Sequence, residues 1–227
     1  MNKKLTLPQT IIITLFCIMM ILAIFNMPQL GIFSIGVSAL FVVIATLSDS
    51  KGIFISIAMV ILGLVLFIKP IYIFDICLNF IIPGIIIGMI TKNVLNHRED
   101  NKYNPIFMGT IAFIIGLIAN YLISKYLFNI NILEEFTSVM KTQLSTQISA
   151  IQESVSSLAS VSNITEESII QTVLNIMPLI LFSRSIMLSI LTYFLAIYTL
   201  KKIRKNDLKE KLKKILILLC VVTAFVK

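Results

Sequence analysis

The sequence predicts an all-α fold: a polytopic bundle of transmembrane helices with six full spans, a partial seventh span, and an extracytoplasmic helical hairpin between spans five and six. The 227 residues are 58% hydrophobic and only 13% charged, which is about half the charge of a soluble domain. The apolar residues form long blocks separated by short polar segments. The longest block, Val173–Leu200, has 28 residues, enough for a helix to cross a hydrocarbon core of about 30 Å.

The first four spans are apolar runs separated by turn residues. Leu5–Phe25 forms helix one, and because no small-x-small cleavage site follows it, we expect an anchor and not a removable signal peptide. Gly31–Leu47 and Gly52–Ile68 have 17 residues each, which is the lower limit for spanning, and only a tight hairpin can join them. Lys69 and Pro70 then precede helix four, Ile71–Thr91.

The second half of the chain alternates polar and apolar segments. After a polar loop at 92–104, helix five begins at Pro105 and runs to about Ile123. Residues 1–214 are predicted to form one transmembrane helical domain, in which 124–172 are an extracytoplasmic helical insertion. Residues 215–227 are the start of an incomplete further membrane helix, because Ile215–Val226 rises only about 18 Å. We expect the chain to be a shortened version of a longer protein.

The outer insertion has the pattern of an amphipathic helix. Apolar residues recur every three or four positions between Leu133 and Val161, with Ser, Thr, Gln and Glu between them. This pattern favours a surface helix, and the alternatives are a lid over a pocket or a surface that pairs with a second copy. Thr165 can cap the next helix, which we expect to run from near Glu166 through span six with a kink at Pro178.

The distribution of cations predicts the orientation in the membrane. With the N-terminus in the cytoplasm, the cytoplasmic segments hold fourteen Lys and Arg residues, and the outer segments hold three, Lys69, Lys125 and Lys141. Because cytoplasmic loops are enriched in Lys and Arg, the sequence predicts a multi-pass protein of the bacterial inner (cell) membrane with a cytoplasmic N-terminus. The same distribution explains the net charge of +8 without a nucleic-acid partner.

Few residues suggest catalytic or cofactor chemistry. Cys17, Cys77 and Cys220 all lie in apolar runs without a CxxC spacing, so we expect buried thiols and no disulfide. The single histidine, His97, has no neighbours with metal-ligand spacing. Phosphate-binding, GxSxG and HExxH motifs are absent from the sequence. We therefore expect a protein that is not an enzyme and has no cofactor or metal.

Four polar residues are predicted to lie at membrane depth. Arg184 is the only charged residue of Val173–Leu200 and lies about 16 Å below the outer boundary. Its side chain points back toward the N-terminus of its helix, where Asp75 lies, with Asn79 and Asn120 nearby. The cluster is either a structural ion pair that locks helices four, five and six, or an outward-facing pocket that binds a polar or anionic solute through Arg184.

Helix four also carries small residues at a spacing that suits helix packing. Pro83 and Gly84 are followed by Gly88, and two glycines four residues apart allow another backbone to come close.

Four parts of the chain resemble the YybS-like bacterial membrane proteins, a family defined as a domain of unknown function. They are Phe80–Asn93, the outer helical segment, Asn175–Ala196 and the basic sequence KKIRK after span six. The resemblance extends from about Pro28 to Lys214. It implies a polytopic membrane protein and brings no activity. The small six-helix form and the polar cluster are more loosely similar to the substrate-capture subunits of energy-coupling-factor vitamin transporters. The Ala-x-x-x-Ala docking face of those subunits is absent from Leu5–Phe25.

Two functions follow from these observations. The first is a non-enzymatic accessory or scaffold protein that acts through a protein partner or as a homodimer. The second is a solute-binding or transport subunit. The lipid bilayer is the expected environment in both cases. Anionic headgroups are expected to contact the basic residues after span six, which are Lys201, Lys202, Arg204 and Lys205.

Overall fold

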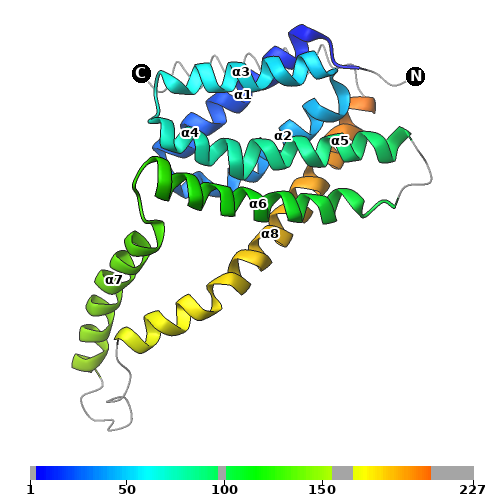
Figure 1. Cartoon of the computed structure of the whole chain (residues 1–227). Helices are drawn as coiled ribbons and strands as arrows, with labels where there is room; N and C mark the ends of the chain where they lie inside the picture. The colour runs from blue at the N-terminus through cyan, green and yellow to red at the C-terminus, as the bar shows by residue number, and fades with distance from the viewer. Residues whose placement is uncertain (1–3, 97–100, 155–165, 206–227) are drawn as a thin grey trace.

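The computed structural model describes residues 4–96, 101–154 and 166–205. All regular elements within these residues are helical (Figure 1). They are α1 (Leu7–Asn26), the 3-10 helix η1 (Pro28–Phe33), α2 (Ser34–Leu47), α3 (Ser50–Val65), α4 (Pro70–Ile76), the π-helix η2 (Cys77–Ile81), α5 (Ile82–Asn96), α6 (Asn104–Leu127), α7 (Ile132–Ser154) and α8 (Glu166–Lys205).

Five helical segments are long and apolar enough to cross a membrane, which supports a multi-pass membrane protein. They are Leu7–Asn26, Gln29–Leu47, Pro70–Asn96, Asn104–Leu127 and Glu167–Ile203. The remaining predicted span, Gly52–Ile68, contains α3, which is apolar but has only 16 residues. The predicted partial span at 215–227 lies outside the described residues, as do Thr165, His97 and Cys220.

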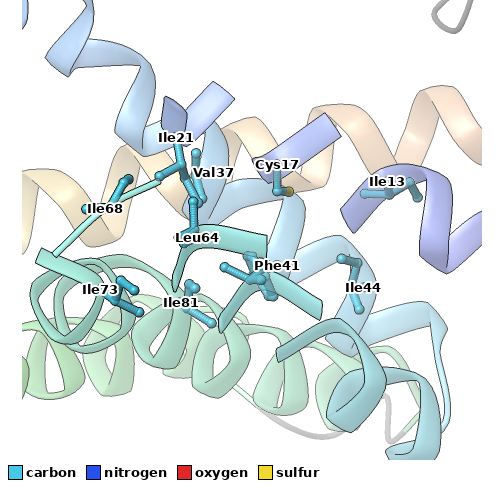
Figure 2. Packing of buried hydrophobic residues seen from close by; sticks show 11 residues of the cluster. Ile13, Cys17, Ile21, Val37, Phe41, Ile44, Leu64, Ile68, Ile73 and Ile81 are labelled. Carbon is cyan, nitrogen blue, oxygen red and sulfur yellow. The ribbon is translucent and has the colours of Figure 1, made fainter. Parts of the chain in front are cut away.

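Helix α2 lies at the centre of the bundle. It contacts α1, α5 and α8, and every residue from Val37 to Leu47 except Leu40 is buried. One face of α2 joins a cluster with α1, α3 and α4, in which Val37 and Phe41 pack near Ile21 and Leu64 (Figure 2). Its other face packs with α5, α6 and α8. A helix that is apolar all round can be buried in this way.

Small residues allow α5 to approach α2 closely. A Cβ atom added at Gly84 would lie 2.6 Å from the Ser38 carbonyl oxygen. A Cβ atom at Gly88 would lie 2.6 Å from both the Val42 carbonyl oxygen and the Ala45 Cβ. Pro83, beside them, is buried. The glycines therefore face the α2 backbone, and any larger residue would push the two helices apart.

Hydroxyl groups link α1 to α3 and to the residue that follows α2. Thr14 Oγ1 donates to Ser56 Oγ at 2.9 Å, and the hydroxyls of Thr10 and Ser48 are 3.1 Å apart. Inter-helix hydrogen bonds of this kind contribute about 0.6 kcal/mol on average inside a membrane protein. Cys17, a free thiol on α1, is fully buried in this part of the core, whereas the free thiol of Cys77 is only partly buried, in contrast to the prediction.

Helices α7 and α8 extend beyond the other helices. Figure 1 shows α7 and the first half of α8 projecting from one end of the bundle, after which α8 crosses the bundle obliquely. Helix α6 continues to Leu127, one turn past the predicted end. Asn129 then adopts a left-handed conformation with φ of 55°, which Asn tolerates better than most residues. Helix α8 is continuous over 40 residues and contains Pro178.

The α2–α5 contact makes a testable prediction for stability. We expect Gly88→Ala to lower the free energy of unfolding by about 1–3 kcal/mol, because the new methyl group overlaps atoms of the α2 backbone. The control is Gly31→Ala, since no heavy atom lies within 4 Å of a Cβ at Gly31. Thermal unfolding of the purified proteins in one detergent measures the difference, and equal midpoints for the two variants would contradict the close packing.

Candidate functional site

The helix that carries Asp75 contains an irregular turn. Helix α4 continues through the π-helix η2 into α5, and the N–H of Ile82 donates to the carbonyl of Cys77, five residues earlier. Ser38 Oγ on α2 donates to the Phe80 carbonyl at 2.8 Å, which gives this wide turn an additional partner. Single π-turns inside α-helices occur frequently at functional sites. The span is consequently one helix, Pro70–Asn96, with an inserted turn.

Asp75 is held by two amide groups. Its Oδ1 accepts hydrogen bonds from Asn79 Nδ2 at 2.6 Å and from Asn120 Nδ2 at 2.7 Å. A carboxylate only accepts hydrogen bonds, so both amides must present their nitrogen atoms. Asn79 is buried, and its Oδ1 has no hydrogen-bond partner among the described residues. The orientation of the Asn79 amide is therefore explained by Asp75.

The close approach of α6 to the π-turn brings Asn120 within reach of Asp75. A Cβ atom at Gly116, one turn before Asn120, would overlap the Leu78 carbonyl oxygen of η2. Only a glycine allows this backbone contact. Gly116 thus positions α6 so that one amide crosses from α6 to the carboxylate on α4.

Asp75 and Arg184 line one cavity. The cavity has a volume of about 510 Å³ and is bounded by α1, η1, α2, α4, η2 and α8. Its apolar wall includes Ile21 and Val37 from the core cluster, and its polar groups include Ser34 and Tyr72. The rings of Phe25 and Tyr72, which both line it, are 5.4 Å apart and pack edge to face.

Arg184 and Asp75 share this cavity without forming a contact ion pair. The guanidinium interacts electrostatically with the Asp75 carboxylate, but within residues 4–96, 101–154 and 166–205 no ion pair of 4 Å or less joins them. Arg184 is also an exposed side chain. By comparison, Lys4 and Asp49 form such a pair at 3.2 Å at the opposite end of the bundle. The guanidinium therefore keeps its hydrogen-bonding capacity available.

The structure thus brings three of the four predicted polar residues into hydrogen-bond contact and places the fourth, Arg184, across the same cavity. Sequence reasoning missed the wall formed by Phe25, Ser34 and Tyr72. These residues lie in segments of ordinary apolar composition, and only the turn at 26–29, next to Phe25, marked a break in the helices there. It also missed Ser189, whose hydroxyl donates to the Ile106 carbonyl on α6 at 2.7 Å, instead of bonding within its own helix.

The cavity lining has a simple chemical character. It offers one carboxylate, one guanidinium, one phenol and one hydroxyl on an apolar wall. In the part of the chain that the structure describes, no group of three or more His, Cys, Asp or Glu side chains could hold a metal ion. Such a lining can bind and orient a small molecule that has both polar and apolar parts.

The predicted headgroup contacts lie at the far end of α8. Lys201 and Lys202 are exposed there, and Lys202 Nζ lies 5.7 Å from the centre of the Tyr198 ring. Arg204 and Lys205 belong to the last turn of the same helix. The four residues share the last turns of α8, and their contact with anionic headgroups stays a prediction.

Comparison with protein-family models shows a match over most of the chain. Residues 14–219 match the family described as "Predicted membrane protein (DUF2232)". No curated protein and no solved structure matches the chain.

The amide cluster makes a prediction that separates hydrogen bonding from charge. Asp75→Asn retains an oxygen that can accept from both amides, whereas Asp75→Leu leaves Asn79 and Asn120 without that partner. We expect Asp75→Leu to lower the free energy of unfolding by about 1–3 kcal/mol and Asp75→Asn to lower it by less. Thermal unfolding in detergent measures both. If Asp75→Asn were as unstable as Asp75→Leu, the charge and not the hydrogen bonds would stabilise the site.

Proposed function

The chain belongs to the DUF2232 family of predicted membrane proteins, and we propose that it binds a small polar solute in the cavity between Asp75 and Arg184. The observation that carries this proposal is the separation of the two charged groups. A purely structural lock should close to hydrogen-bond contact, because an unpaired cation at membrane depth costs about 2.5–3.5 kcal/mol on insertion scales. Here the carboxylate is held by two amides, and the guanidinium lines an open cavity. The proposed role is binding and not catalysis.

The shape of the bundle supports a site with one opening. The cavity lies among the C-terminal part of α1, the start of α2, and α4, which meet at one end of the bundle. Beyond Val37, α2 is buried on both faces through to Leu47. We propose that this close packing closes the other end to a polar solute. This arrangement supports capture of a solute from one side, as in the substrate-capture subunits that the chain loosely resembles.

The proposal includes an orientation. We propose six spans, with α3 as the short one, in a bacterial inner membrane with the N-terminus in the cytoplasm. The end that carries Lys69 and the cavity then faces outward, and α7 with the first half of α8 forms the extracytoplasmic hairpin. The YybS-like resemblance belongs to the same proposal, since the family match covers the segments that carry it.

The orientation can be tested at the two ends of α3. Lys51 lies in the first turn of α3 and Lys69 follows its end, and both side chains are exposed. In a variant whose native cysteines are replaced by serine, we expect Lys69→Cys to react with a membrane-impermeant maleimide in intact cells. Lys51→Cys should react only after the membrane is permeabilised, because it faces the cytoplasm. The opposite pattern would reverse the orientation and place the cavity on the cytoplasmic side.

A second candidate function is that of an accessory protein that acts through a partner. The projecting helix α7 favours this candidate. Within the described residues, the main contacts of α7 are with α6 and α8. Figure 1 shows α7 away from the other helices. A partner protein or a second copy could therefore reach it. A dimer mass, or a co-purified protein, in the native mass spectrum of the detergent-purified chain would support this candidate.

The solute-binding proposal is tested by native mass spectrometry of the wild type beside Arg184→Leu. We expect a bound small molecule on the wild type and at least tenfold lower occupancy on Arg184→Leu, with an unchanged unfolding temperature. Losing one charge-assisted hydrogen bond of about 1.5–3 kcal/mol corresponds to such a change.

The matched control is Lys125→Leu, which removes a cation from the same end of the bundle. Lys125 is exposed, lies beside the rings of Tyr121 and Tyr126, and does not line the cavity. Its variant should retain the solute. The proposal fails if the wild type carries only annular lipid, or if Arg184→Leu is folded and carries the same bound mass.

A further inference from the structure

We infer that the solute is a zwitterion with an apolar body, whose ammonium or similar donor group binds Asp75 and whose acid group binds Arg184. This inference rests on the proposed function and specifies the chemical class of the solute. The shared chemistry is found in free amino-acid-like molecules and in the headgroup of phosphatidylethanolamine. The observations that carry it are the free hydrogen-bonding positions of the two charged side chains, their presence in one cavity, and the lining between them.

Asp75 has a free hydrogen-bond acceptor, and Arg184 has free hydrogen-bond donors. Both amide hydrogen bonds to Asp75 end on Oδ1, and Oδ2 accepts none from the described residues. The Arg184 guanidinium has five N–H donors, and none is used within the described part of the chain. One cavity therefore offers an anionic acceptor and a cationic donor group, each of which still needs a partner.

Charge balance excludes the simpler solute classes. A solute with only an acid group would gain from Arg184 but would be repelled by Asp75 in the same cavity. A solute with only an ammonium group would meet the reverse situation. Because Asp75 is only partly exposed, its charge is less screened than in water, which enlarges these penalties on its side of the cavity. A molecule with both groups gains a charge–charge attraction at each end, which neither singly charged class does and which a neutral polar solute lacks.

The rest of the lining fits an apolar body. Ile24, Ile76 and Phe80 line the cavity in addition to the Phe25–Tyr72 ring pair. Aromatic faces near an ammonium group add a cation–π attraction. A volume of about 510 Å³ lies within the usual range for a ligand pocket and exceeds what an ammonium and an acid group need by themselves.

The experiment uses three probes with one apolar body and different charges. They are L-phenylalanine, its deaminated analogue 3-phenylpropionate, and its decarboxylated analogue 2-phenylethylamine. Each is titrated by thermal shift against the wild type, Asp75→Asn, Arg184→Gln and the control Lys125→Gln in phosphatidylglycerol nanodiscs. Asp75→Asn is the informative variant, because it removes the charge and retains an acceptor for both amides.

The expected result is that L-phenylalanine binds the wild type and Lys125→Gln at least tenfold more tightly than either analogue. Asp75→Asn and Arg184→Gln should each weaken L-phenylalanine by about tenfold. In addition, Asp75→Asn should bind 3-phenylpropionate more tightly than the wild type does, because the repulsion is gone. This gain on one probe and loss on another is a readout that a purely structural effect would not produce.

Repeating the titration in nanodiscs with phosphatidylethanolamine identifies the source of the zwitterion. A weaker apparent affinity for L-phenylalanine there would indicate that the lipid headgroup competes for the site, whereas an unchanged affinity would indicate a free solute. Both results support the charge assignment.

Two results would overturn the inference while the proposed function stands. In the first, 3-phenylpropionate binds the wild type as tightly as L-phenylalanine does. In the second, a solute seen in the native mass spectrum is lost from Arg184→Gln and retained on Asp75→Asn. If no probe binds and the wild type carries no small molecule, the proposed function itself fails.

Discussion

The burial of α2 on both of its faces is the constraint on which the rest of the structure depends. One face closes the core with α1, α3 and α4, and the other closes it with α5, α6 and α8. This is possible because Gly84 and Gly88 let α5 lie directly on the α2 backbone. In a membrane, packing and hydrogen bonds drive helix association, so such close contacts determine the arrangement. The cavity exists where this tight packing ends, at the start of α2 near Val37.

Polar groups inside the bundle show two different uses. Most hydroxyl groups satisfy backbone carbonyls of their own helix or reach a neighbouring helix, as Thr14 and Ser189 do. Asp75 is different, because two amides from separate segments converge on one of its oxygen atoms. That arrangement fixes the carboxylate and leaves its other oxygen available. Arg184 forms no ion pair with Asp75 within the described residues, so opposite charges stay apart in one cavity, and this is why we propose binding and not a lock.

The two ends of the bundle are built differently. At the end with Lys4 and Asp49, an ion pair, the Thr10–Ser48 contact and a bond from Lys92 Nζ to the Ser48 carbonyl at 2.9 Å join neighbouring helices. At the other end lie the cavity and the projecting α7. Under the proposed function, this asymmetry suits a protein that binds its solute from one side of the membrane. Helix α7 projects from the end that holds the cavity, so a partner bound to α7 would lie near the cavity.

Composition was enough to predict a membrane protein, because helices satisfy the backbone hydrogen bonds of long apolar blocks inside a bilayer and the chain is only 13% charged. Helical spacing and depth were also enough to put Asp75, Asn79 and Asn120 near one another. Periodicity could not reveal the π-turn at Cys77–Ile81, since a single inserted residue leaves no apolar signature. The tertiary structure alone decided that Arg184 stays apart from Asp75 and that Phe25 and Tyr72 complete a cavity. Those facts depend on how closely helices distant in sequence approach, which is set by contacts such as that of Gly116 with Leu78.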